Sequence, residues 1–176
     1  MWIGDDMFVT PETAVVEGLG PGDDLYITGL FSEHYGKQRN LPIVRSGTLA
    51  AMPAEPVADY QTGLEYPAYI IEARSTGGLS GSPVFVRFAV GRVHEKKINL
   101  QNDRFFFLGL VRGHWNYKSK GPALAFSEDE AQNVNMGMAL VVPSDEVRRL
   151  LFSDALTAKR RDFDLQLAKQ HAPTDD

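Results

Sequence analysis

The sequence predicts an all-β domain, either a barrel or a sandwich, that is followed by a C-terminal helix. Short apolar or alternating runs fill residues 1–142 and are interrupted by Gly, Pro, Asn and Asp, as is typical of strands joined by turns. No helical pattern separates these runs, which argues against parallel β-α-β units. From residue 143 onward the apolar spacing becomes that of a helix.

Six runs are predicted as strands. The first follows the turn signal "GPGD", the second is bounded by prolines, and the fifth is very apolar and is expected at the centre of a sheet. The predicted strands cover residues 23–31, 41–53, 68–73, 82–90, 104–113 and 136–143. Two longer connections are expected at the surface: a polar hairpin over 91–103, and a mixed loop over 116–135 with one helical turn near "SEDEA".

The C-terminal helix is predicted from its start signal and its apolar face. Ser144 is the expected N-cap, with acidic residues in the following turn. Val147, Leu150 and Leu151 fall on one face at helical spacing. The basic run over 158–162 is interpreted as a solvated helix face rather than a nucleic-acid site.

The composition excludes several classes of function. The chain has 176 residues, a formal charge of −5 and no cysteine, so thiol chemistry is excluded, and folding requires neither a disulfide nor a metal. The negative charge argues against nucleic-acid and anionic-membrane partners. The N-terminus has no signal-peptide pattern, and no apolar run is long enough to cross a membrane. A cytoplasmic location is the default if Met1 is the true start, and no cofactor is expected.

The segment "GGLSGSP" carries the main functional hypothesis. Ser80 lies among small residues directly before a predicted strand. A serine nucleophile needs a base and two converging backbone N–H groups, and glycines permit the unusual backbone that such convergence requires. Gly78 and Ser80 would supply these two amides. The alternative is a glycine-rich turn in which the hydroxyl only bonds to backbone groups.

The pattern G-x-S-G-[GS]-P between two strands resembles the nucleophile segment of trypsin-like (chymotrypsin-fold) serine peptidases. The longer stretch "IIEARSTGGLSGSPVF" is similar to the cysteine-free bacterial branch of that family, and the similarity extends over residues 18 to 152. The resemblance implies that Ser80 is the catalytic nucleophile. It also implies that Val111, Arg112 and Gly113 lie along the substrate backbone, and that Arg74 lies near the floor of the specificity pocket. An inward-facing Arg74 would favour an acidic substrate side chain, whereas an exposed loop arginine is the simpler interpretation.

Only the second of the two barrels of that family is matched. We therefore expect a trypsin-like β-barrel over 1–143, a C-terminal α-helix over 144–170 packed on the barrel, and a disordered tail over 171–176. The general-base histidine and the orienting aspartate of the family belong to a first barrel that would precede the matched region. That missing N-terminal barrel is the expected partner in cis, and a peptide or protein is the expected substrate.

The four histidines are the only local candidates for a replacement base. His114 directly follows the expected substrate strand and is the most interesting of them. His94 and His34 are interpreted as solvated loop residues, and His171 falls in the expected tail.

The sequence thus predicts the nucleophile-bearing half of a serine peptidase, with its acid–base residues outside this chain. Two alternatives stay open: an inactive module that binds peptides by strand addition, and a small β domain unrelated to peptidases. We also expect poor solubility or self-association of this chain alone, because the surface facing the first barrel would be apolar and exposed.

Overall fold

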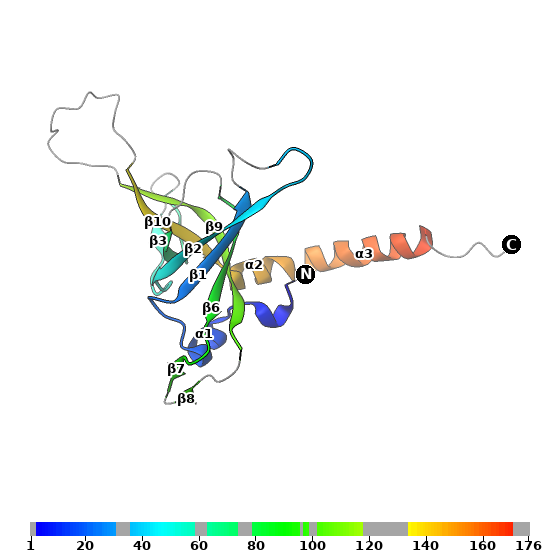
Figure 1. Cartoon of the computed structure of the whole chain (residues 1–176). Helices are drawn as coiled ribbons and strands as arrows, with labels where there is room; N and C mark the ends of the chain where they lie inside the picture. The colour runs from blue at the N-terminus through cyan, green and yellow to red at the C-terminus, as the bar shows by residue number, and fades with distance from the viewer. Residues whose placement is uncertain are drawn as a thin grey trace, which may run out of the picture.

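A computed structural model of the chain describes residues 3–30, 36–58, 63–73, 79–95, 97–98, 102–117 and 134–170. In this part of the chain, six strands close into an antiparallel barrel, with two helical segments before it and two helices after it (Figure 1). The elements are η1 (Asp5–Met7), α1 (Pro11–Glu17), β1 (Asp24–Leu30), β2 (Pro42–Ala51), β3 (Val57–Ala58), β4 (Glu65–Tyr66), β5 (Tyr69–Ala73), β6 (Pro83–Phe88), β7 (Val93–His94), β8 (Lys97–Ile98), β9 (Arg104–Tyr117), β10 (Val134–Pro143), α2 (Ser144–Leu151) and α3 (Asp154–Gln170).

The barrel has the strand order β1-β2-β5-β10-β9-β6, and every neighbouring pair is antiparallel. The last strand, β10, is therefore inserted between β5 and β9. The pairs β3–β4 and β7–β8 form separate two-stranded sheets. The all-β class, the barrel and the C-terminal helical region are confirmed, and the closed barrel excludes the sandwich.

The six barrel strands coincide with the six predicted ones, and the hairpin expected within 91–103 is β7–β8. The main difference in length concerns β9 and β10. These strands pair as far as Tyr117 and Val134, where the sequence pattern suggested a loop. Residues 118–133, with the helical turn expected near Ser127, lie outside the described residues.

Alternating side chains of all six strands fill the barrel. Burial alternates strictly in β6, for example, because successive strand residues face opposite sides. Each large apolar side chain of this kind contributes about 1.5–3 kcal/mol when it is fully buried. The most deeply buried positions are Leu25, Ile27, Leu49, Ile71, Val84, Val86, Phe88, Leu108, Val111, Ala139 and Val141.

Helix α1 was not predicted, although its sequence carries standard signals. The hydroxyl of Thr10 accepts a hydrogen bond from the Thr13 amide, and Pro11 occupies the first helical turn. Gly18 ends the helix in the left-handed conformation, with φ of 64°. The short apolar or alternating runs around this helix favoured a strand interpretation, so its start and stop signals were not recognised.

The C-terminal helical region differs from the single helix over 144–170 that was expected. Pro143, not Ser144, is the N-cap of α2, because the Ser144 hydroxyl is buried and donates to the Val9 carbonyl at 2.7 Å. Helix α2 packs on β9 and β10, whereas α3 extends away from the barrel (Figure 1). Leu150 and Leu151 are exposed rather than packed on the barrel. The expected tail, 171–176, lies outside the described residues.

One end of the barrel, which we call the clamped end, is covered by α1 and the N-terminal segment. This end comprises the start of β1 and β5 and the end of β2, β6 and β10. Three arginines of the barrel region bind acidic residues of the N-terminal segment, in the pairs Arg148–Asp5, Arg104–Glu17 and Arg92–Asp23. These pairs join residues far apart in the sequence and hold the segment against the barrel.

Candidate functional site

The opposite end of the barrel, which we call the serine end, carries Ser80 on a tight turn. The turn begins at Leu79, which is buried, and the Ser82 amide donates to the Leu79 carbonyl at 2.9 Å. Gly81 has φ of 83°, the positive value that the third residue of a type II turn requires. Ser80 itself is exposed. The glycine thus permits a turn that leaves Ser80 exposed at the surface.

The turn is tied to the middle of β9. The Gly81 amide donates to the Val111 carbonyl at 2.7 Å, and the Val111 amide donates to the Ser82 carbonyl at 2.9 Å. Strand β6 starts directly after the turn, with Pro83 opposite Leu110. Ser80 is therefore held beside β9. Both backbone groups of Val111 bind the turn. They are therefore not available to a peptide, and backbone contact with a peptide would have to come from the residues that follow Val111 in β9.

Arg112 and Gly113 continue β9 past the turn. Gly113 pairs with Leu140 of β10, and the register between β9 and β10 shifts at Arg112. The Arg112 guanidinium stacks on the Tyr66 ring, 3.8 Å from its centroid. Within the described residues, no strand other than β10 pairs with β9 beyond Leu110. This part of β9 therefore continues past the serine turn as the neighbour of β10.

Several expected site residues lie outside the described residues. They are Arg74, Gly78, His34 and His171, together with the side chain of His114, whose backbone belongs to β9. Of the two amides expected to bind an oxyanion, the structure therefore describes only that of Ser80.

His94 is the one histidine whose side chain is described, and it lies at the clamped end. Its Nε2 atom is 3.0 Å from the Val15 carbonyl oxygen of α1, in an exposed contact, so His94 is partly solvated and also contacts α1. Strand β6, of six residues, separates this region from the serine turn by about 20 Å at ~3.3 Å per residue. His94 is too far from Ser80 to take its proton.

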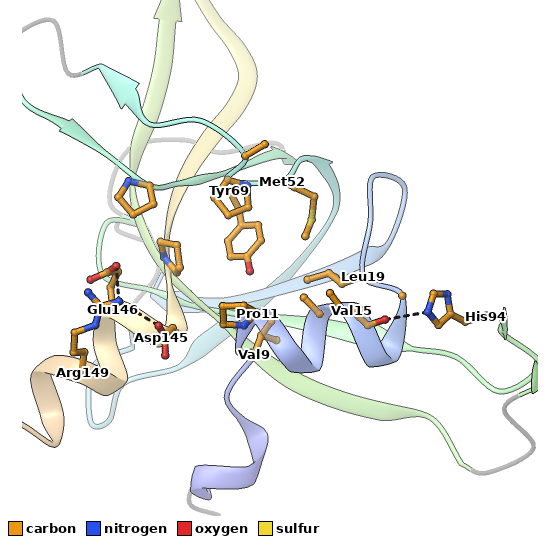
Figure 2. Close-up of a pocket in the computed structure, with 16 residues that line it drawn as sticks. Val9, Pro11, Val15, Leu19, Met52, Tyr69, His94, Asp145, Glu146 and Arg149 are labelled. Atoms are coloured by element: carbon orange, nitrogen blue, oxygen red, sulfur yellow. Dashed lines mark hydrogen bonds and ion pairs between the residues drawn. The ribbon is translucent and has the colours of Figure 1, made fainter.

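The clamped end contains a groove of about 730 Å³ that the sequence did not indicate (Figure 2). Tyr69 points into it above α1, and burial, reinforced by the charge of Asp145, raises the pKa of Tyr69 to about 12. Four prolines contribute to the lining, and Asp145, Glu146 and Arg149 of α2 lie at one end. The prolines are Pro11, Pro53, Pro67 and Pro143.

In the described part of the chain, no group of three His, Asp or Glu side chains is arranged to hold a metal ion. No described helix combines the length and apolar character needed to span a bilayer.

Comparison with family models, with curated proteins and with solved structures yields no match for this chain. The site is therefore interpreted from its own geometry and from the motif around Ser80.

Proposed function

We propose that this chain is the nucleophile-bearing, peptide-binding barrel of a trypsin-like serine peptidase. The observation that carries the proposal is the position of Ser80. It is exposed on a glycine turn, and the flanking residues hydrogen-bond to Val111 of β9. The closed antiparallel barrel is compatible with the fold that the motif implies.

In the proposed reaction, a peptide lies along β9 beyond Val111 and presents a carbonyl carbon to Ser80. The Ser80 oxygen bonds to that carbon, the hydroxyl proton passes to a general base, and the amine of the cleaved bond leaves after receiving a proton. The amides of Gly78 and Ser80 stabilise the negative charge that develops on the carbonyl oxygen. Arg74 would contribute to substrate choice from the segment preceding the turn. The base comes from outside the described residues, since His94 lies at the other end of the barrel.

The test is covalent labelling with a fluorophosphonate probe. The protein used is this chain extended by the sequence translated from the DNA upstream of Met1. We expect labelling at Ser80, and loss of labelling by at least 100-fold in Ser80→Ala, because the probe reacts with activated serine hydroxyls.

Ser82→Ala is a matched control. Ser82 lies in the same turn, but it is buried, so its replacement leaves labelling unchanged. An extended protein that is not labelled, or one labelled equally well after Ser80→Ala, would contradict the proposed nucleophile.

A second candidate function is peptide binding without hydrolysis. The position of the serine turn beside β9 favours it, because backbone pairing of a peptide with a strand requires no base. In that case, a fluorescent extended peptide binds the chain with the same affinity before and after Ser80→Ala, and the probe labels neither protein. An in-frame stop codon directly upstream of Met1 would also favour this candidate.

A further inference from the structure

The groove at the clamped end has the size and the walls of a small-molecule site. Its volume of about 730 Å³ lies within the range of roughly 300–1000 Å³ that is usual for ligand pockets. Its lining is mostly apolar and includes Val9, Leu19 and Met52. The Val9 carbonyl accepts from the Ser144 hydroxyl, and the Leu19 amide donates to the backbone of α1. These walls are therefore in place before a ligand arrives, which lowers the free-energy cost of binding.

The hydroxyl of Tyr69 is a polar group without a protein partner in this groove. Tyr69 is only 5% exposed, and its hydroxyl points into the groove (Figure 2). Within the described part of the chain, no group forms a hydrogen bond with this hydroxyl. Its pKa of about 12 keeps it protonated at neutral pH, so it can donate a hydrogen bond. Because buried polar groups normally have a partner, the hydroxyl indicates a ligand that carries an acceptor.

The end of the groove formed by α2 is negatively charged. The Nη2 atom of Arg149 lies 3.2 Å from a carboxylate oxygen of Asp145 and 3.0 Å from one of Glu146. Among the described residues that line the groove, these three are the only formally charged ones, and His94 lies at the opposite end, against α1 (Figure 2). Two carboxylates thus share one guanidinium, and this end favours a cation over an anion.

We propose that the groove binds a small organic amine that has an apolar body and a hydrogen-bond acceptor. The apolar body contacts Leu19 and Met52, and the acceptor binds the Tyr69 hydroxyl. The protonated amine lies beside Asp145 and Glu146. Tyr69 lies between the apolar part of the groove and the α2 end (Figure 2), so a single small molecule can reach all three. The inference does not depend on the peptidase function, because no residue of the serine end takes part.

The first experiment locates the binding site by NMR. Backbone amide shifts of the full chain are followed during titration with phenylalaninol, which carries a phenyl ring, a hydroxyl and a protonated amine. We expect the amides of Leu19, Ala54 and Glu146 to shift, and that of Gly81 in the serine turn to stay unchanged. The proposal is wrong if no groove amide shifts up to the solubility limit of the probe. It is also wrong if these amides shift with protein concentration alone, which would indicate that a second copy fills the groove.

A second pair of titrations tests the hydrogen bond of Tyr69. Phenethylamine is phenylalaninol without its hydroxymethyl group. We expect phenylalaninol to bind about threefold more tightly, the effect of one hydrogen bond. Tyr69→Phe keeps the ring in the groove and should remove this difference while phenethylamine binds as before. A preference for phenylalaninol that persists in Tyr69→Phe would contradict the role given to the hydroxyl.

A third comparison tests the charge at the α2 end. Hydrocinnamate has the same phenyl ring but carries a carboxylate, so phenethylamine should bind about fivefold more tightly. Asp145→Asn combined with Glu146→Gln leaves Arg149 unpaired and should reverse this order. Asp162→Asn combined with Asp164→Asn is the matched control, because it removes two carboxylates from α3, which extends away from the barrel (Figure 1). An order that the first pair leaves unchanged, or that the control pair also reverses, would overturn the proposed amine site.

Discussion

The two ends of the barrel are built differently. At the clamped end, three arginine–carboxylate pairs hold the N-terminal segment, and α1 covers the barrel opening. At the serine end, the described residues show an exposed serine, a glycine with positive φ and a turn that is hydrogen-bonded to β9. The difference indicates that these three ion pairs stabilise the end of the barrel that does not carry Ser80.

The largest expected effect is at the clamped end. Phe88 is fully buried, and its ring lies 5.3 Å from that of Phe106. Phe88→Ala should lower the free energy of unfolding by about 3–5 kcal/mol, because it removes buried apolar surface and leaves a cavity. Urea denaturation measures this loss. Phe105→Ala, at a residue that is 44% exposed, should cost about 1 kcal/mol or less; equal losses would mean that burial does not distinguish the two positions.

A matched pair of glycines compares the ends directly. Gly81 of the serine turn and Gly91 after β6 both have φ of 83°, and an added Cβ would meet no atom within 4 Å at either position. Changing either residue to alanine should therefore cost about 1 kcal/mol of stability, since the strain is in the backbone alone. Only Gly81→Ala should also reduce fluorophosphonate labelling of the extended protein. A similar reduction by Gly91→Ala would show that labelling follows stability rather than the geometry of the turn.

The effect confined to the narrowest range of conditions concerns alkaline pH. The pKa of Tyr69 is raised from 10.0 to about 12 in the folded protein, so above pH 10 the unfolded chain releases this proton more readily than the folded one. The stability that the neutral phenol contributes is present below pH 10 and is lost as the pH rises towards 12. The melting temperature, measured between about pH 9 and 12, should fall less steeply with rising pH in Tyr69→Phe than in the unchanged protein. Equal declines of the melting temperature in the two proteins would contradict the assignment of this loss of stability to Tyr69.

Sequence reasoning located the barrel strands because their side chains alternate between core and surface, as the burial of β6 shows. It also singled out the serine turn, whose glycines reflect a local backbone requirement. It did not find α1, although Thr10, Pro11 and Gly18 are recognisable as its boundaries. The groove was not predictable, because Tyr69 and Glu146 meet there only through the closure of the barrel.

The place of Ser144 shows a second limit. A serine followed by acidic residues is a common N-cap pattern, and nothing local indicates that its hydroxyl binds the carbonyl of Val9, 135 positions earlier. Long-range contacts of this kind decide whether a residue with a clear local N-cap pattern acts as the N-cap.

The insertion of β10 between β5 and β9 has a consequence for synthesis on the ribosome. Until residues 134–143 have emerged, one edge of β5 and one edge of β9 lack the partner that β10 supplies, and unpaired strand edges promote association with other chains. The barrel thus cannot close during most of translation, and it closes only after β10 has emerged from the ribosome. A pause or premature stop before that point should yield a product prone to aggregation rather than a smaller folded unit.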